Sequence, residues 1–191
     1  MTNLATSNTP ALAAQAQNPA RQDDTPQQYL TFLLGGEMFA VGILNVKEII
    51  EYGTVTPIPM MPPFIRGVIN LRGAVVPVID LSSRFGNNPS QVSRRTCIVI
   101  IEVSEGEERQ DIGIVVDAVS EVLEIPRGEI EPPPAFGAKI RADFITGMGK
   151  VGGRFVIILN VSQVLSVDEI SLLSQIGTGE PVPEAGAETT H

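Results

Sequence analysis

The sequence FIRGVINLRGAVVPVID, residues 64–80, is the clearest indication of the fold of this chain. Its apolar residues are mostly Val and Ile, which pack well on the pleated surface of a sheet. The pair Arg72-Gly73 interrupts them as a tight turn would. The stretch therefore predicts a strand, a turn and a second strand. Two arginines, Arg66 and Arg72, lie within it, and their function is the question that the sequence raises.

The same pattern returns later in the chain. The glycine and apolar positions of residues 64–80 recur at an offset of 80 in residues 144–160, and VKEIIE at 46–51 recurs at an offset of 73 as VSEVLE at 119–124. Because glycines and acids match as well as apolar positions, we favour an internal duplication over a chance similarity between Val-rich strands. The second copy carries seven extra residues, around EPPPAFGAKIRAD.

The duplication predicts a mainly β fold of two small barrels of about five strands each, which share a core because each is too small to fold alone. We expect the first barrel at about 28–86, the second at about 96–160, and a helical segment at 161–176. Segments 1–27 and 177–191 lack a periodic apolar pattern, so we expect disordered tails there.

Several shorter segments support this division. QYLTFLLGGEMFAVGI predicts two strands around the Gly35-Gly36 turn, and TCIVIIEV and DIGIVVDAV predict two more. ILNVKEIIE has the spacing of either a short helix or an extension of a strand. The segment GMGKVG, residues 147–152, has the spacing of a dinucleotide-binding motif. A strand follows it where such a site needs a helix, so we interpret it as a turn of a barrel.

Composition argues against most classes of function. The net charge of −9 would repel a polyanion such as DNA, and no apolar stretch is long enough to span a membrane. A single cysteine, Cys97, excludes an internal disulfide and a zinc site, and we expect an ordinary buried thiol. The only histidine is His191, near the end of a predicted tail, so no Ser-His or Cys-His pair is expected. We therefore expect a soluble, cytoplasmic protein without a catalytic, cofactor or metal site.

Two alternatives stay open from the residues alone. Arg66 and Arg72 could form a surface that a partner recognises, or they could only keep an edge strand soluble. Acidic residues recur at the repeated positions Glu48, Glu51, Glu121 and Glu124. They could be a duplicated docking face or the solvated side of a short amphipathic element, and either explains the repeat better than paired catalytic carboxylates do.

Four segments together resemble the CheW family of bacterial chemotaxis coupling proteins. They are YLTFLLGGEMFAVGILNVKEII, PPFIRGVINLRGAVVPVIDL, IGIVVDAVSEVLEI and FITGMG. The resemblance runs from about residue 28 to residue 176, and GVINLRG and GIVVDAVSEVL are its most specific parts. It implies two packed five-stranded SH3-like or OB-like barrels. It also implies a non-enzymatic adaptor that links the cytoplasmic tips of methyl-accepting chemoreceptors to the histidine kinase CheA in membrane-associated arrays, with possible contacts to other copies of itself.

The resemblance also implies a site. In the family, the arginine of the NLRG turn belongs to the receptor-facing surface, together with its neighbours and the VKE segment. In this chain the receptor- and kinase-binding residues are then Val46, Glu48, Arg66, Gly67, Val68, Asn70, Arg72 and Gly73. Val46 and Val68 would line an apolar groove for a helix, and the IEPPPAF stretch would supply the ring contacts Glu131 and Phe136. Relatives can carry a basic residue where this chain has Glu131, so that contact could differ here.

A different class of function remains as the competing hypothesis. An OB-like barrel can bind an oligonucleotide or an oligosaccharide, which requires a basic groove and exposed aromatic side chains for stacking. The charge of −9 and an aromatic content of 5% argue against it.

Overall fold

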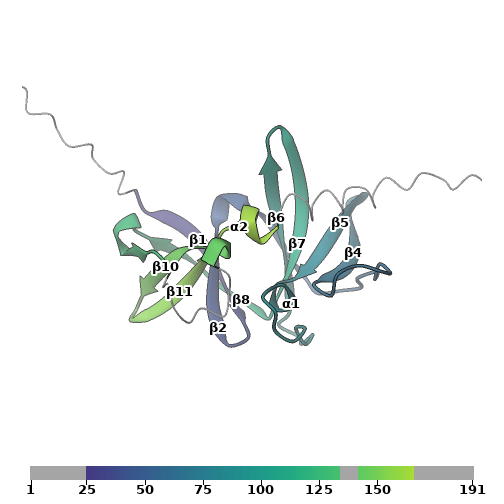
Figure 1. The fold of residues 1–191 in the computed structure, drawn as a ribbon, viewed down its shortest axis with the longest axis horizontal. Helices are drawn as coiled ribbons and strands as arrows, with labels where there is room; N and C mark the ends of the chain where they lie inside the picture. Colours follow the sequence, from purple (N-terminus) through teal and green to yellow (C-terminus); the bar gives the residue numbers. More distant parts are fainter. Residues whose placement is uncertain (1–24, 134–141, 166–191) are drawn as a thin grey trace, which may run out of the picture.

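The computed structural model describes residues 25–133 and 142–165, and their strands form two sheets that lie side by side (Figure 1). We call the six-stranded sheet barrel A and the five-stranded sheet barrel B. In strand order, barrel A contains β8 (Ala118–Ile125), β1 (Gln27–Leu34), β2 (Glu37–Gly42), β11 (Arg154–Leu159), β10 (Ile145–Val151) and β9 (Ile130–Glu131). Barrel B contains β3 (Val46–Glu51), β6 (Cys97–Glu105), β7 (Glu108–Val116), β5 (Ala74–Asp80) and β4 (Ile65–Leu71).

Helices in the described residues are short. They are η1 (Ile43–Asn45), α1 (Leu81–Arg84), η2 (Arg127–Glu129), η3 (Ala142–Phe144) and α2 (Val161–Val164). In this part of the chain no helix has the length and apolarity needed to cross a membrane. The predicted helical segment 161–176 thus begins with α2, but everything after residue 165 lies outside the described residues, as do residues 1–24.

The mainly β fold is confirmed, and the two repeats have matching geometry. β4, β5 and α1 correspond to β10, β11 and α2 at the offset of 80, and β3 corresponds to β8 at the offset of 73. Asp80 N–H donates to the Phe64 carbonyl at 2.7 Å, and Asn160 N–H donates to the Phe144 carbonyl at 2.8 Å. The pairing register also shifts at the same place in both hairpins. This equivalence lets each barrel serve as a reference for the other.

The predicted division of the chain into barrels at 28–86 and 96–160 is wrong, because the repeats exchange their hairpins. The β1–β2 hairpin joins β8 to β11 in barrel A, and the β6–β7 hairpin joins β3 to β5 in barrel B. Only Asp117 separates β7 from β8. The shortest common loop that reverses a strand has two residues, so β8 cannot fold back onto its own hairpin and continues into the other barrel.

Two of the shorter segments also differ from the prediction. ILNVKEIIE contains both a helix and a strand, η1 followed by β3. Most of GMGKVG lies within β10, and the turn begins only at Gly152. β11 follows this turn, so no helix N-terminus faces the glycines as a dinucleotide site would require.

A shared apolar core joins the two barrels, as the small size of each predicted. Adjacent residues of a strand face opposite sides, so each sheet contributes one set of side chains to the shared core and one to its own interior. The buried part of the shared core consists of Leu30, Phe32, Leu34, Phe39, Val41, Ile79, Leu81, Phe85, Val99, Ile101, Val103, Ile112, Ile114, Val116, Phe144, Ile145, Leu159, Val164 and Leu165. Smaller clusters fill barrel A (Tyr29, Ala40, Ile125, Val156 and Ile158) and barrel B (Val76, Val78, Ile98, Ile100 and Val115).

Candidate protein-interaction site

The turn between β4 and β5 holds Arg72 at the tip of a hairpin. Arg72 and Gly73 have φ values of 52° and 84°, the left-handed region at both central positions that a type I′ turn requires. The Asn70 side chain accepts a hydrogen bond from Gly73 N–H at 3.0 Å and closes the turn. The Arg72 side chain is 78% exposed. The turn therefore presents the guanidinium to solvent.

The position of Arg72 is conformationally costly for an arginine. A non-glycine residue in the left-handed region loses about 1 kcal/mol relative to glycine. The equivalent position in barrel A is Gly152, which has a φ of 56° and makes the same turn without this cost. Barrel B thus keeps an arginine at a turn position where barrel A has glycine.

Glu48 on β3 lies next to Arg72. The Arg72 Nη2 atom is 2.5 Å from Glu48 Oε2, so the pair joins the hairpin tip to the edge strand of the same sheet. Glu48 is 22% exposed, and its Oε1 is buried without a hydrogen-bond partner among the described residues. An ion pair with one highly exposed member adds little stability, so it mainly orients the two groups. The geometry brings together two of the predicted site residues and leaves one carboxylate oxygen unsatisfied.

Three of the predicted site residues, Gly67, Val46 and Val68, mainly serve the local packing of the strands. Gly67 has a φ of 144°, and a Cβ atom there would lie 2.1 Å from the carbonyl oxygen of Thr56. This close approach arises because Thr56 and Val68 exchange two backbone hydrogen bonds of 2.9 Å. Val46 and Val68 are half-buried, and Val46 packs against the shared core. Gly67 is therefore required for the segment before β4 to close against that strand.

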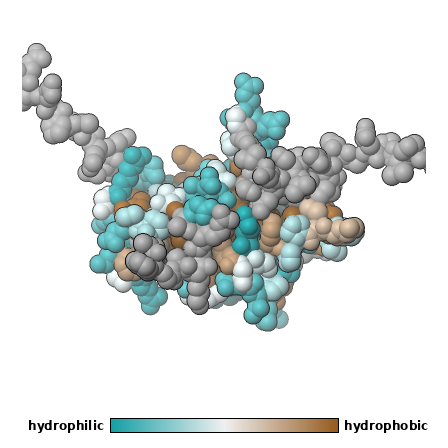
Figure 2. All heavy atoms as spheres, in the orientation of Figure 1, coloured by the Kyte–Doolittle hydropathy of each residue, from teal (hydrophilic) through white to brown (hydrophobic). Residues whose placement is uncertain are grey.

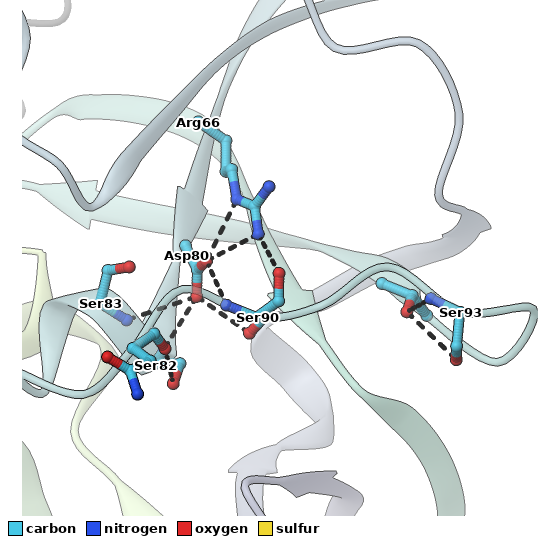
Figure 3. Close-up of polar contacts among 8 residues, drawn as sticks. Arg66, Asp80, Ser82, Ser83, Ser90 and Ser93 are labelled. Atoms are coloured by element: carbon cyan, nitrogen blue, oxygen red, sulfur yellow. Dashed lines mark hydrogen bonds and ion pairs between the residues drawn. The ribbon is translucent and has the colours of Figure 1, made fainter.

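Arg66 faces the interior (Figure 3). Its Nε and Nη2 atoms lie 3.1 and 3.0 Å from Oδ2 of Asp80, which is fully buried, and Nη2 also donates to the Ser90 carbonyl. The Arg66 side chain is 24% exposed, against 78% for Arg72. The two arginines of the opening stretch thus differ, because one is fixed inside the barrel and the other projects from its tip.

Asp80 is the centre of this interior network, and the sequence reasoning missed it. Besides Arg66, its carboxylate accepts hydrogen bonds from Ser82 N–H at 3.0 Å, Ser83 N–H at 3.4 Å, Ser90 N–H at 2.9 Å and Ser90 Oγ–H at 3.0 Å. It therefore caps α1 and ties the loop after α1 to β4 and β5. An aspartate directly before LSS is a helix N-cap signal that could have revealed part of this function.

Exposed apolar side chains occupy equivalent positions in the two barrels. Ile49 on β3 corresponds to Val122 on β8, and Val75 on β5 corresponds to Phe155 on β11; all four are exposed. Figure 2 shows apolar side chains over the β4–β5 end of the molecule and polar ones over the projecting tip of β6–β7. The repeat thus gives each barrel exposed apolar side chains at the same two positions.

In barrel A, Phe155 borders a groove of about 530 Å³. Its apolar side chains come from several neighbouring strands, and Glu37, Glu121 and Arg154 supply charges. The apolar members are Leu33, Met38, Leu123, Met148, Val151, Phe155, Val156 and Ile157. A second cleft, of about 670 Å³, is more polar and lies where the β1–β2 turn meets residues 82–93. Neither cavity is lined by Val46 or Val68, the residues predicted to line a groove.

Three residues named in the sequence analysis remain: Glu131, Phe136 and Cys97. Glu131 is exposed on β9, where it pairs with Met148 of β10, and Phe136 lies outside the described residues. Cys97, where we expect an ordinary buried thiol, is half-buried at the start of β6, and its thiol donates to the Arg95 carbonyl at 3.4 Å. Within residues 25–133 and 142–165, no group of three or more His, Cys, Asp or Glu residues could hold a metal ion.

The family model and the similar proteins found by comparison all indicate the same family. The family model described as CheW-like domain matches residues 28–169. The chain is 36% identical over 150 residues to the chemotaxis protein CheW of Klebsiella aerogenes, covering 78% of this chain and 88% of that protein. It is 32% identical over 143 residues to CheW of Rhizobium meliloti, covering 75% and 90% of the two chains.

A solved structure agrees with these relatives. The scaffolding protein TtCheW from Thermoanaerobacter tengcongensis superposes with a TM-score of 0.68 at 34% identity, and the match covers 80% of this chain and 96% of that one. The two exchanged hairpins, the duplicated strand–turn–strand units and the NLRG turn all lie within the part of the chain that the family model matches. This chain belongs to the CheW-like family.

Proposed function

We propose that this protein is a non-enzymatic adaptor that couples methyl-accepting chemoreceptors to the histidine kinase CheA. The observation that carries the proposal is Arg72. The chain holds this arginine at a left-handed turn tip where the other repeat has glycine, and it leaves the side chain 78% exposed beside Glu48. A conformational cost without a gain in folding stability is typical of a residue that a partner recognises.

An adaptor must bind two partners at once, and the duplicated fold supports this. Each barrel carries exposed apolar side chains at equivalent positions, and a shared core joins the barrels, so one chain can present two separate surfaces. We propose that the Arg72 and Glu48 surface of barrel B binds the cytoplasmic tip of the receptor. Asn70, Gly73, Arg66 and Gly67 would hold that hairpin in place, and Val46 and Val68 would support it from below.

The second partner would be the regulatory domain of the kinase. We propose that Glu131 and Phe136 take part in this contact, and that the protein is cytoplasmic and recruited to membrane-associated receptor arrays through its partners. Other copies of this chain would occupy the same contact. Charged groups at the edge of such interfaces mainly set specificity and association rate, whereas apolar contacts supply most of the affinity.

The decisive experiment is co-sedimentation with receptor-bearing membranes and CheA. We compare the wild type with Arg72→Glu and Arg72→Lys. The matched control is Arg94→Glu, since Arg94 is exposed and its side chain makes no hydrogen bond or ion pair with the described residues. We expect the wild type and the control to pellet with the membranes and raise kinase activity. Arg72→Glu should lose receptor binding, and Arg72→Lys should be intermediate because lysine lacks the planar guanidinium.

Two results would contradict the proposal. If the wild type stays in the supernatant with its cognate receptor and kinase, the adaptor function is wrong. If Arg72→Glu binds as well as Arg94→Glu, the function can stand but the assigned surface is wrong. A mobility shift with single-stranded DNA tests the competing oligonucleotide hypothesis, and the net charge of −9 predicts no shift.

A further inference from the structure

Arg84 joins the two barrels at equivalent points of the repeat. It lies at the end of α1 in barrel B, and its guanidinium carbon is 4.9 Å from the ring centroid of Phe64 and 4.8 Å from that of Phe144. Phe64 precedes β4 of barrel B, and Phe144 precedes β10 of barrel A at the offset of 80. One cation therefore lies over two rings that belong to different barrels.

A directional hydrogen bond accompanies these ring contacts. Arg84 Nε–H donates to the carbonyl oxygen of Val164 at 2.9 Å, and Val164 is the last residue of α2. Arg84 and Val164 are themselves equivalent positions of the two repeats. Because the second repeat has valine where the first has arginine, this link between the barrels is formed by one repeat alone. At this pair of equivalent positions, the two repeats therefore contribute differently to the interface.

A row of phenylalanine rings runs through the interface near Arg84. Phe32, Phe39, Phe85 and Phe144 form a continuous row, with ring centroids 6.1, 5.7 and 6.2 Å apart along it. Apolar burial supplies most of the free energy that holds the barrels together but has no preferred direction of its own, so it fixes their angle only through how closely the side chains pack. A guanidinium between two rings with an Nε–H bond depends on both distance and orientation. Arg84 is therefore suited to fix the angle between the barrels.

We propose that Arg84 is a positioning residue that fixes the orientation of barrel A relative to barrel B. Its consequence for signalling rests on the proposed adaptor function. If the two barrels present the receptor-binding and kinase-binding surfaces, then the angle between them sets the geometry in which receptor and kinase are held. Loss of Arg84 would leave both surfaces intact but would loosen their relative placement, so binding and kinase control would respond differently.

The direct test measures the distance between the barrels by pulsed electron paramagnetic resonance. Spin labels are attached at Glu51→Cys on β3 and Lys150→Cys on β10, two exposed positions, in a Cys97→Ser background. Arg84→Met removes the charge and the Nε–H donor but keeps an unbranched side chain. Arg84→Lys keeps the charge over the rings and loses the planar donor. Arg94→Met is the matched control, because Arg94 is exposed.

We expect the distance distribution to become about twice as wide in Arg84→Met, to widen less in Arg84→Lys, and to stay unchanged in Arg94→Met. Identical distributions in all variants would overturn the proposal. Thermal unfolding followed by circular dichroism checks that each variant is folded. If Arg84→Met does not fold, Arg84→Lys decides: a wider distribution supports the proposal, and a distribution like the wild type overturns it.

A functional measurement separates this proposal from the adaptor function itself. Arg84→Met should sediment with receptor-bearing membranes within about twofold of the wild type, while its stimulation of CheA falls about fivefold or more. Receptor binding and kinase stimulation that are both like the wild type, despite a wide distribution, would overturn the predicted consequence for signalling. If the wild type itself fails to bind receptor, the adaptor function fails, while the spin-label distances still decide whether Arg84 fixes the barrels.

Discussion

Asp80 and Asn160 begin the short helices α1 and α2 at equivalent positions of the two repeats, but only the aspartate caps its helix with its side chain. Their backbone angles are nearly the same, with φ and ψ of −88° and 105° at Asp80 and −90° and 98° at Asn160. The two repeats therefore share the backbone geometry at this position but differ in whether the side chain caps the helix. The position equivalent to Arg66 is Thr146, so barrel A also lacks the cation that pairs with the carboxylate.

Asp80→Asn should destabilise the protein by about 2–3 kcal/mol. The amide keeps the shape of the side chain but removes the charge, which leaves Arg66 without its carboxylate partner inside barrel B. Arg66 is 24% exposed, so water offsets part of this loss. Urea unfolding followed by far-UV circular dichroism measures the change. Asn160→Ala is the matched control and should cost less than about 1 kcal/mol, because its side chain makes no capping bond. Equal losses in the two variants would show that the network adds nothing.

Gly67→Ala should be strongly destabilising. The new Cβ would lie 2.1 Å from the Thr56 carbonyl oxygen, which is backbone and is held by two hydrogen bonds, so the segment before β4 would have to move. We expect a loss of about 3 kcal/mol or more in the free energy of unfolding. Gly86→Ala is the control, because Gly86 also has a positive φ, of 84°, but has open space at its Cβ. It should cost only about 1 kcal/mol. A similar cost at both positions would mean that the close approach is not rigid.

The exchange of hairpins between repeats predicts a specific cross-link. Gln28 of β1 and Glu124 of β8 are paired in the sheet of barrel A, and the Gln28 Nε2 atom lies 3.3 Å from Glu124 Oε1. Gln28→Cys with Glu124→Cys, in a Cys97→Ser background, should form an intramolecular disulfide under mild oxidation, because paired strand residues bring their Cβ atoms within reach. Non-reducing electrophoresis detects it.

A control pair distinguishes the exchanged arrangement from barrels built in chain order. Gln28→Cys with Glu51→Cys joins β1 to β3, which lie in different sheets. This pair should remain reduced under the same conditions. Efficient cross-linking of Gln28 to Glu51, and not to Glu124, would refute the observed topology.

The sequence predicted the strands well because their patterns are local. Alternating Val and Ile, the Gly35-Gly36 turn and the Arg72-Gly73 turn each act within a few residues of the chain. Which strands pair could not be predicted in the same way, since both repeats contain equivalent strands and either hairpin could complete either barrel. The single residue between β7 and β8 carried part of that information. Local signals thus determine the elements, whereas short connections help to determine their partners.

The same distinction explains the site. The exposed position of Arg72 could be predicted from the local turn sequence. The interior position of Arg66 depends on Asp80 and Ser90, which are 14 and 24 residues away. The contact of Arg84 with Phe144 depends on the packing of two barrels, which no local pattern encodes. Residues that act through their own turn can be found from sequence, and residues that act through a packed neighbour require the structure.

The raised pKa of Tyr29 predicts how the free energy of unfolding changes at alkaline pH. Burial raises the pKa of its hydroxyl above 10.0, and Arg127 offsets this in part. The folded state therefore holds this proton more tightly than the unfolded chain does. Below pH 10 the hydroxyl is protonated in both states, and the contribution of Tyr29 to the free energy of unfolding is fully present. This contribution is lost as the pH rises through the pKa of the folded state.

Tyr29→Phe should therefore lose less stability than the wild type when the pH rises from 8 to about 10.5. At pH 8 the variant should differ by less than about 1 kcal/mol, since it loses only the hydrogen bond from Tyr29 Oη to Gln27 Oε1. Urea unfolding at both pH values measures the difference. Parallel losses in the two proteins would show that Tyr29 does not sense the pH change.

Arg72→Gly should separate stability from function at the tip of the hairpin. Glycine removes the cost of a left-handed φ and reproduces the turn that Gly152 makes in barrel A, whereas the loss of the exposed pair with Glu48 costs little. Glycine also gives the unfolded chain more freedom, which offsets part of the gain. The net effect should lie between no change and about 1 kcal/mol of added stability. Co-sedimentation with receptor-bearing membranes should nevertheless be lost.

Gly152→Arg is the reciprocal variant and gives the matched test. It places an arginine at the equivalent turn of barrel A, where Glu121 is the counterpart of Glu48. This change should cost about 1 kcal/mol because it introduces the strain that Arg72 already bears, and it should leave receptor binding intact. If Arg72→Gly unfolds more easily than the wild type by more than about 1 kcal/mol, the arginine is kept for folding. If it stays stable and still binds the receptor, then neither folding nor recognition accounts for a strained arginine at this turn.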